Sequence, residues 1–526
     1  MTNEATEMGS RSLASRIGLL CGPILAFLTI WLLPSEYVLD DSVRSFDWAG
    51  RATLGMMVWM SVWWLTEAVN VTITSLLPLA MFPLLQINSI ADTAAPYAHK
   101  LIFLYMGGFF LALAMQRWGL GKRIALWTIR TVGVTPYRII GGFMLTTAVF
   151  SAFVSNTATA VMMVAIASNL TDLKKGTDGD ESDSGGFATC LMLAIAYSAS
   201  IGGMATIIGT PPNTFLVGYL RDSIDPAYRM EISFQQWLWY GVPVTILLLP
   251  CTYFLLIWLH PIKTGPMQGG LTWIESELKR LGRIRFPEWI VLAVFVLTVS
   301  LWMCSGSLSA WEWTMGGEVV RPFAYLSDEA IVMASSFLLF VIPSGRGRHE
   351  RSGSEAETSP YDRIGDRFVL EWPIAEKLPW GILLLFGGGL TLANAVKQHA
   401  VAEFLASQTS SLSGLPTWML ILGVTAAVVF LTELTSNAAT TASLIPILAA
   451  IAPSLGIHPY LLVFPATFAA SCAFMLPVAT PPNAIVFGTG AISGRQMART
   501  GIYLNLMAVV VIVLLTLLWL RPLLNL

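Results

Sequence analysis

Two short polar motifs lie inside long apolar stretches of the chain. Residues 155–157 read Ser-Asn-Thr and residues 436–438 read Ser-Asn-Ala, and no charged residue or histidine lies within 154–160 or 435–441. Hydroxyl and amide oxygens are the ligands that hard cations such as Na⁺ prefer. The N–H groups at a helix N-terminus bind anions. The residue types therefore indicate binding of small cations together with a small anion.

A second motif, Thr-Pro-Pro-Asn, occurs once in each half of the chain, at 210–213 and at 480–483. Consecutive prolines remove two backbone donors and stop a preceding helix. In hydrocarbon, the carbonyl groups freed by such a break must find partners inside the protein or in a water-filled cavity. We therefore expect two helices that are broken near the middle of a membrane, over 187–220 and 459–490.

The four motifs contain no Lys or Arg. A divalent anion held between them would have to be neutralised by co-bound cations as well as by helix dipoles. This requirement favours cation-coupled transport of the anion over plain anion exchange.

The composition is that of a polytopic membrane protein. Of the 526 residues, 55% are hydrophobic and only 12% are charged, and apolar runs long enough to cross a bilayer recur from end to end. The net charge is −2 and the basic residues are spread over short loops, which excludes nucleic acid as a partner. The five cysteines are dispersed without a CxxC pair, so we interpret them as small apolar side chains and not as a metal centre.

The two halves of the chain repeat the same order of motifs. A glycine-containing span, at 103–116 and again at 383–396, precedes the Ser-Asn motif, and the Thr-Pro-Pro-Asn motif follows it. The first half is longer because of a polar insertion at 171–186. A lone Ser-Asn-Thr triplet in a membrane helix is more often a helix–helix contact than a ligand site. Its recurrence beside the same proline motif favours the binding role.

Basic residues predict which loops are cytoplasmic. We assign those at 117–138, 263–285 and 346–351 to the inside. With a cytoplasmic N-terminus and re-entrant hairpins over 139–170 and 416–451, the chain has eleven crossings. An odd number of crossings per half inverts the second half, so the hairpin tips enter from opposite sides and meet near the midplane.

Two acidic residues allow two interpretations, and one tryptophan-rich stretch has a simple one. Glu67 and Glu433 lie within or next to predicted spans, where a carboxylate is a functional candidate by default. Because each follows a threonine beside a polar segment, hydrogen bonding to hairpin backbone is an equally good interpretation. Residues 59–64, WMSVWW, are most simply a lipid-facing or interfacial surface.

Residues 470–486, ASCAFMLPVATPPNAIV, have the form of a signature of the divalent anion:sodium symporter family, which includes di- and tricarboxylate transporters. The paired Ser-Asn motifs are another hallmark of that family. The chain resembles it from about residue 50 to 520. The resemblance implies an all-α membrane protein of about eleven transmembrane helices plus two re-entrant hairpins, an inverted repeat with helices broken at the midplane. It also implies a homodimer built through a scaffold domain and a transport domain that moves like an elevator.

The resemblance implies a division of the chain into seven parts. In order, they are a cytoplasmic N-terminal tail (1–16), the first scaffold helices (17–100), a first transport half (101–235), further scaffold helices (236–343), a cytoplasmic linker (344–378), a second transport half (379–494) and a last scaffold helix (495–526).

The resemblance also implies the ligands, by matching position. The first sodium site would consist of Ser151, Ser155 and Asn156 with the backbone of Gly202 and Gly203. The second would consist of Thr432, Thr435 and Asn437 with the backbone of Ala479. The substrate would contact Asn156, Thr157, Asn437 and Ala438, with Thr210, Pro211, Thr480 and Pro481 lining the breaks. Ala438 is a departure, because the second motif often reads Ser-Asn-Thr; the missing hydroxyl bears on which anion is bound.

The sequence thus predicts a sodium-coupled symporter of divalent organic anions, most simply C4 dicarboxylates such as succinate. Na⁺ would be the co-transported ion, with no organic cofactor. The protein would lie in the plasma (inner) membrane with its C-terminus outside. A sodium-independent dicarboxylate exchanger and an anion channel remain alternatives. An intramembrane hydrolase is disfavoured, since the chain has no HExxH motif and no histidine near Ser155 or Ser436 in sequence.

Overall fold

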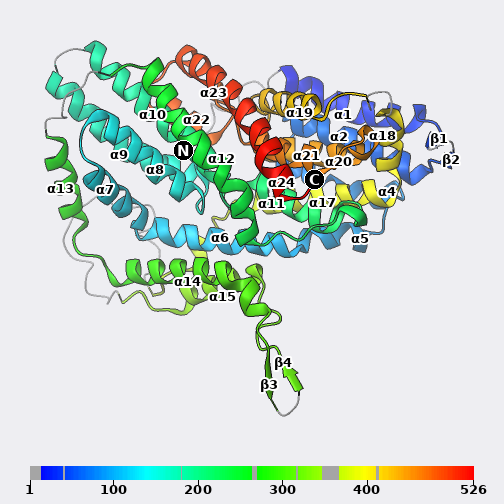
Figure 1. Ribbon diagram of the computed structural model, residues 1–526, viewed down its shortest axis with the longest axis horizontal. Coiled ribbons are helices and arrows are strands. Elements are labelled where there is room, and N and C mark those ends of the chain that lie inside the picture. Colours follow the sequence, from blue (N-terminus) through cyan, green and yellow to red (C-terminus); the bar gives the residue numbers. More distant parts are fainter. Residues whose placement is uncertain are drawn as a thin grey trace.

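The computed structural model describes residues 13–39, 42–178, 181–262, 269–315, 318–345, 367–409 and 414–526. These residues form a bundle of helices with two small antiparallel β-hairpins (Figure 1). The predicted tail up to residue 12, linker residues 346–366 and residues 179–180 of the polar insertion lie outside the described residues.

The elements before the first hairpin are α1 (Leu13–Leu32), β1 (Glu36–Leu39), β2 (Ser42–Ser45), α2 (Trp48–Thr66), α3 (Val71–Ser75), α4 (Leu77–Leu84), α5 (Ile90–Ala94), α6 (Lys100–Arg117) and α7 (Leu120–Val132). The first motif-bearing half continues with α8 (Pro136–Ser151), α9 (Asn156–Asp178), α10 (Glu181–Gly203) and α11 (Pro211–Gly218). Between the halves lie α12 (Phe234–Leu259), α13 (Gly270–Leu281), α14 (Phe286–Ser309), β3 (Trp313–Met315), β4 (Glu318–Val320) and α15 (Asp328–Val341).

The second half contains α16 (Trp372–Ala375), α17 (Trp380–Gln398), α18 (Val401–Thr409), α19 (Thr417–Thr432), α20 (Asn437–Ile451), α21 (Tyr460–Ala470), α22 (Pro481–Gly488), α23 (Gly494–Leu515) and α24 (Arg521–Leu523). Both predicted hairpins are present, as α8–α9 and α19–α20. Both predicted broken helices are present as well, as α10–α11 and α21–α22. In α11 and α22 the two prolines occupy the first turn, where a backbone N–H has no partner within the helix in any case.

The two halves of the chain interlock. The half-helix α11 of the first half packs against α20 and α21 of the second, and α22 of the second half packs against α9 and α10 of the first. Figure 1 shows the first hairpin, α8–α9, toward one end of the long axis and the second, α19–α20, toward the other. The side from which each hairpin enters a membrane stays a prediction.

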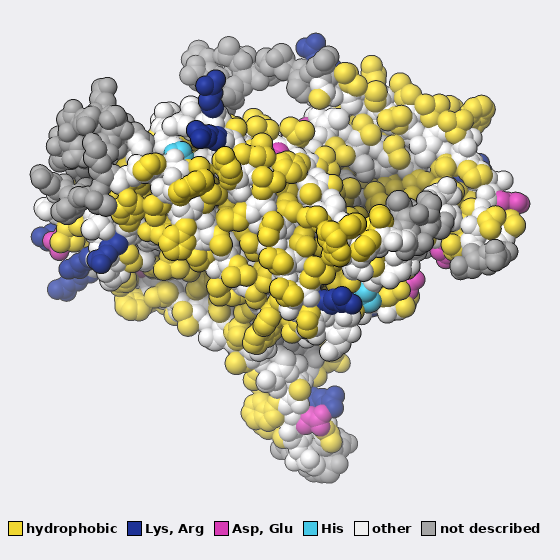
Figure 2. Space-filling view, turned by 45° about the horizontal axis from the view of Figure 1, so that its top comes forward, with side chains coloured by type: hydrophobic (Ala, Val, Ile, Leu, Met, Phe, Trp, Pro, Cys, Tyr) yellow, Lys and Arg dark blue, Asp and Glu magenta, His cyan; other side chains and the backbone are white. Residues whose placement is uncertain are grey.

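Much of the surface is apolar. Seven stretches of the described chain are helical, long and apolar enough to cross a membrane, judged by length and composition: Ala14–Leu32, Ile90–Arg117, Gly186–Gly203, Phe234–Leu259, Phe286–Ser309, Trp380–Gln398 and Gly494–Leu523. Figure 2 shows hydrophobic side chains across the middle of one face and most Lys and Arg side chains near its margins. The number of eleven membrane crossings stays a prediction, and so does the division of the chain into seven parts.

Two basic segments that we expected as loops are the helices α7 and α13. Lys122 Nζ of α7 lies 2.9 Å from Glu277 Oε2 of α13, and the buried Arg123 Nε lies 2.7 Å from Glu288 Oε2 at the start of α14. Arg123 also donates to the carbonyl oxygen of Gly282 at 2.8 Å. Because these partners are distant in sequence, the local pattern of charges did not reveal that the two segments are packed helices.

The stretch 59–64 is not a uniform lipid-facing surface. Trp64 is fully buried, and its Nε1 donates to the carbonyl oxygen of Val71 at 3.2 Å. Trp59 and Trp63 are half-buried and stack edge to face on each other. The lipid-facing interpretation is therefore wrong for Trp64, which helps to join α2 to α3.

Candidate functional site

Ser151, the last residue of α8, connects the first hairpin to α10 through its hydroxyl group. Its side chain is fully buried, and its hydroxyl lies 2.6 Å from the carbonyl oxygen of Ala199 and 2.5 Å from Asn156 Oδ1. Asn156 is the first residue of α9, and Ala199 lies in the last turns of α10. The structure thus brings a hydroxyl, an amide oxygen and a carbonyl oxygen together at the base of the first hairpin tip.

Further oxygen atoms converge on the amide of Asn156. Its Oδ1 position lies 3.2 Å from the carbonyl oxygen of Ala199 and 3.3 Å from that of Gly209. An amide oxygen that faces only acceptors is unfavourable unless the amide turns to present Nδ2, which then donates to them, or a cation lies among the oxygens. A set of hydroxyl, amide and carbonyl oxygens is what Na⁺ requires of a protein site.

Glycines allow the backbone of α10 to reach this cluster. A Cβ on Gly203 would come within 2.7 Å of Asn156 Oδ1, so the residue lies directly against the amide. A Cβ on Gly202 would overlap the backbone of Ala148 in α8. Gly203 therefore lies beside Asn156 and Gly202 lies against α8, and their part in a cation site stays a prediction.

We expect Gly202→Ala to lower the free energy of unfolding by about 1–3 kcal/mol, because the added methyl group forces α8 and α10 apart. Thermal unfolding of the purified protein in detergent measures this effect. Gly423→Ala is the matched control, since a Cβ on this exposed glycine of α19 would meet nothing within 4 Å. Equal melting temperatures for the two variants would show that the close approach of α8 and α10 is not needed.

The second hairpin repeats the bonding pattern of the first. Thr432, the last residue of α19, is fully buried, and its hydroxyl lies 2.8 Å from Asn437 Oδ1 and 2.8 Å from the carbonyl oxygen of Ala470. Asn437 begins α20 and Ala470 ends α21. The same three kinds of oxygen therefore meet at the base of both hairpin tips, as an internal repeat of one binding site would require.

Three other predicted cation ligands make contacts within their own segments of the chain. The hydroxyl of Thr435 bonds to the carbonyl oxygen of Leu431 at 3.0 Å and to Thr440 Oγ1 at 2.6 Å, within its own hairpin. The N–H of Ala479 donates to the carbonyl oxygen of Leu476, and the carbonyl oxygen of Ser155 accepts from the N–H of Thr159. Their assignment to the cation sites stays a prediction.

The substrate-side residues differ in exposure between the two halves. Thr210 and Thr480 are buried, each just before the prolines that begin its half-helix, and Thr480 Oγ1 accepts from the N–H of Asn483 at 3.3 Å. Pro211 is half-buried, whereas Pro481 is exposed. At the hairpin tips, Thr157 is exposed and Ala438 is half-buried. The first break is therefore enclosed by the protein, and the second reaches the surface.

Glu433 holds the backbone of the second break. Its buried carboxylate accepts hydrogen bonds from three consecutive N–H groups, those of Phe474 at 2.6 Å, Met475 at 2.9 Å and Leu476 at 3.1 Å. The amide Nδ2 of Asn505 in α23 donates to the same carboxylate at 2.7 Å. The interpretation as a backbone-binding carboxylate is thus confirmed for Glu433, although its partners belong to the break and not to the hairpin.

Glu67 is not a counterpart of Glu433. It follows α2 with a positive φ of 46° and ends the helix, and its carbonyl oxygen accepts from Ser15 Oγ at 3.2 Å. The position that matches Glu433 in the first hairpin is Ala152, whose carbonyl oxygen accepts from the hydroxyl of Thr206. A neutral hydroxyl therefore supports the first break where a carboxylate supports the second. Sequence reasoning missed Thr206 and Asn505, since nothing local indicates their partners.

Comparisons with known proteins identify the family and several relatives of this chain. A family model described as "Sodium:sulfate symporter transmembrane region" matches residues 15–526. The sodium-dependent dicarboxylate transporter SdcS of Staphylococcus saprophyticus subsp. saprophyticus is 40% identical over 516 residues, covering 97% of this chain and 92% of the relative. SdcS of Staphylococcus aureus strain USA300 is 37% identical over 507 residues, covering 95% and 90%.

Two solved structures share the fold at low sequence identity. Neisseria gonorrhoeae MtrF, described as one of a class of antimetabolite efflux pumps, aligns with a TM-score of 0.54 and 11% identity over 98% of this chain and 97% of its own. The Alcanivorax borkumensis YdaH transporter, described as having an unusual topology, aligns with a TM-score of 0.51 and 14% identity over 95% and 96%. At this identity the likeness shows the fold alone, that of helical membrane transporters.

Proposed function

The chain belongs to the sodium:sulfate symporter family and is a multi-pass membrane transporter, not an enzyme; on that premise we propose that it couples the entry of a divalent organic anion to that of Na⁺. The observation that carries the proposal is the repeated oxygen cluster at Ser151 and Asn156 and at Thr432 and Asn437. Two such clusters would hold two cations beside one anion.

The proposed substrate is a C4 dicarboxylate such as succinate. Curated relatives at 37–40% identity over nearly the whole chain are named sodium-dependent dicarboxylate transporters. The motifs themselves carry no Lys or Arg, so co-bound Na⁺ and the N-termini of the helices would neutralise the two carboxylates. This is the physical reason for sodium dependence, because the anion alone would be held by dipoles only.

We propose that Asn156, Thr157, Asn437 and Ala438 contact the anion between the hairpin tips, beside the two prolines of each break. Access would alternate by rigid movement of this unit, as an elevator, within a homodimer. The protein would lie in the plasma (inner) membrane with its N-terminus in the cytoplasm and its C-terminus outside.

Uptake of labelled succinate by proteoliposomes tests this function. The proposal predicts accumulation with an inward Na⁺ gradient and none when choline replaces Na⁺. Uptake that needs preloaded internal dicarboxylate and ignores Na⁺ would replace symport by exchange. Flux that does not saturate and never accumulates against a gradient would indicate a channel.

We expect Ala438→Thr to change the preference among anions and to leave the Na⁺ dependence intact. Ala438 is half-buried and follows Asn437 at the start of α20, so a threonine there restores the hydroxyl that Thr157 provides in the first motif. A hydrogen bond gained or lost at the ligand is worth about 1 kcal/mol, or roughly fivefold in relative affinity. Competition of unlabelled succinate, citrate and sulfate against labelled succinate measures it; an unchanged ranking would remove Ala438 from the set of selectivity residues.

A further inference from the structure

We propose that Asn213 and Asn483, the last residues of the two Thr-Pro-Pro-Asn motifs, are positioning residues that fix the carbonyl oxygens of the helix breaks for cation binding. Asn213 would thereby couple the first cation site to the substrate-binding break beside it, and Asn483 occupies the equivalent position in the second half. This inference rests on the proposed sodium-coupled function and deepens it.

Asn213 holds the backbone of the first break. The residue is fully buried, and its Nδ2 lies 2.8 Å from the carbonyl oxygen of Thr206, 3.1 Å from that of Gly203 and 3.3 Å from that of Met204. These carbonyls lie between the end of α10 and the start of α11. In a membrane interior they need donors from elsewhere in the protein. The amide group of Asn213 therefore supplies donors to this turn in addition to those from Trp237 Nε1 and the N–H of Gly209.

Asn483 does the same in the second break. It is also fully buried, and its Nδ2 lies 3.1 Å from the carbonyl oxygen of Ala473 and 3.0 Å from that of Leu476. In both halves the amide reaches back ten and seven residues along the chain. In both halves Oδ1 of the asparagine is buried and has no hydrogen-bond partner. The two asparagines therefore occupy equivalent positions in the internal repeat.

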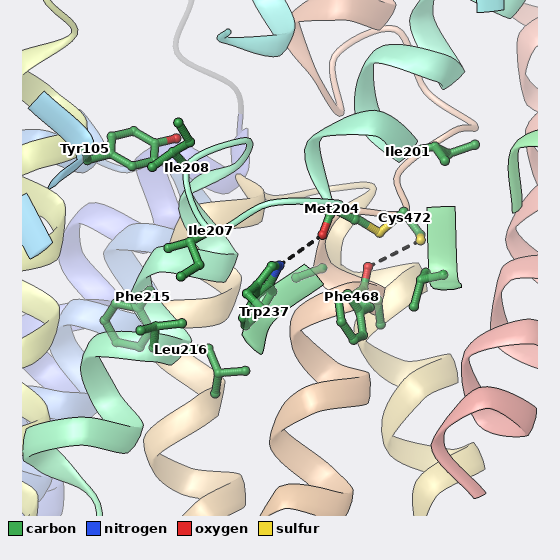
Figure 3. Close-up of a cluster of buried hydrophobic side chains, with 14 of the residues drawn as sticks. Tyr105, Ile201, Met204, Ile207, Ile208, Phe215, Leu216, Trp237, Phe468 and Cys472 are labelled. Carbon is green, nitrogen blue, oxygen red and sulfur yellow. Dashed lines mark hydrogen bonds between the residues drawn. The ribbon is translucent and has the colours of Figure 1, made fainter. Parts of the chain in front are cut away.

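The other side chains that support the breaks differ between the halves. In the first break the hydroxyl of Thr206 accepts from the N–H of Gly209, and Trp237 Nε1 donates to the carbonyl oxygen of Met204 (Figure 3). In the second break the carboxylate of Glu433 binds three N–H groups instead. The two breaks thus use different side chains as hydrogen-bond partners for their backbone groups. The asparagine is common to both breaks, which points to a task that the two sites share.

The position of Asn213 connects the cation cluster to the substrate side. Its amide holds Gly203, which lies directly against Asn156 of the first oxygen cluster. Its own backbone belongs to the first turn of α11, next to Thr210 and Pro211, and its N–H donates to the carbonyl oxygen of Thr210. A cation that draws the oxygens of the cluster together therefore acts on the same turn that would face the anion. Such a link makes the binding of cation and anion mutually dependent.

The test is the Na⁺ activation of succinate uptake in proteoliposomes containing the full chain. Asn213→Leu and Asn483→Leu keep the shape of the side chain and remove both donors, and Asn213→Ser and Asn483→Ser are milder variants that fold more readily. We expect the Na⁺ concentration for half-maximal uptake to rise about tenfold, which corresponds to about 1.4 kcal/mol of cation binding. The ratio of Li⁺-supported to Na⁺-supported uptake should also change, because carbonyl positions set the size of a cation site.

Asn169→Leu is the matched control, since Asn169 is exposed on α9 and its amide bonds only within that helix, to the carbonyl oxygen of Ala165. Stabilisation of the detergent-solubilised protein by Na⁺, read as a melting shift, provides a second measurement that needs no transport. Variants that lose uptake rate or stability but keep the wild-type half-maximal Na⁺ concentration and Li⁺ ratio would overturn the inference and leave the proposed function standing. Wild-type protein without any Na⁺ dependence would overturn both.

Discussion

Replacing Asn156 or Asn437 with alanine is expected to abolish Na⁺-dependent uptake while the protein stays folded in detergent. Each asparagine begins a hairpin helix and shares its side-chain oxygen with a buried hydroxyl, Ser151 in the first half and Thr432 in the second. Alanine removes that oxygen from the oxygen cluster and the amide from the tip of the hairpin. Since both asparagines are only partly buried, the loss of packing is small.

The matched variant for this experiment is Asn169→Ala, whose amide lies on an exposed face of α9 and bonds only to its own helix. Uptake of labelled succinate is measured at saturating Na⁺, and size-exclusion profiles and melting temperatures report on folding. If Asn156→Ala and Asn437→Ala both transport at the rate of Asn169→Ala, neither oxygen cluster is a transport site.

The second large effect is expected at Glu433. Glu433→Ala leaves the N–H groups of Phe474, Met475 and Leu476 without this acceptor, and a buried unpaired donor such as that of Phe474 costs about 1–3 kcal/mol. The variant should therefore melt at a clearly lower temperature and should lose the function of the second site. Glu433→Gln keeps one acceptor oxygen and removes the charge, so we expect an intermediate loss of stability.

Glu403→Ala provides the comparison for this loss. Its carboxylate pairs with Arg44 at 2.6 Å, but both side chains are largely exposed, and an exposed ion pair contributes little to stability. Melting curves of the purified variants in detergent measure the difference. Equal melting temperatures for Glu433→Ala and Glu403→Ala would show that the carboxylate does not support the second break.

The elements that carry the site could be predicted because each has a strong local cause. Two prolines in a row begin α11 and α22, each after a break that separates the half-helix from the preceding α10 or α21. The order of motifs is the same in both halves, so a single pattern observed twice placed both hairpins and both breaks. Ser151 and Asn156, and likewise Thr432 and Asn437, lie five residues apart across a hairpin tip, and the turn brings them together.

The partners that the sequence did not predict belong to other elements of the fold. Asn505 reaches Glu433 from α23, which is 72 positions away, and no local period connects the two. Arg123 and Glu288 form their pair between α7 and α14 across 165 positions of the sequence. Such contacts depend on which helices pack together, and hydrophobic periodicity specifies an apolar face without specifying its neighbour.

Coupling at the two oxygen clusters can be measured as the entry of radioactive sodium into proteoliposomes with and without external succinate. We expect succinate to stimulate sodium entry, and the stimulation to disappear in Asn156→Ala and in Asn437→Ala. Sodium entry that is the same with and without succinate, in vesicles that still take up succinate, would contradict coupling at the two oxygen clusters.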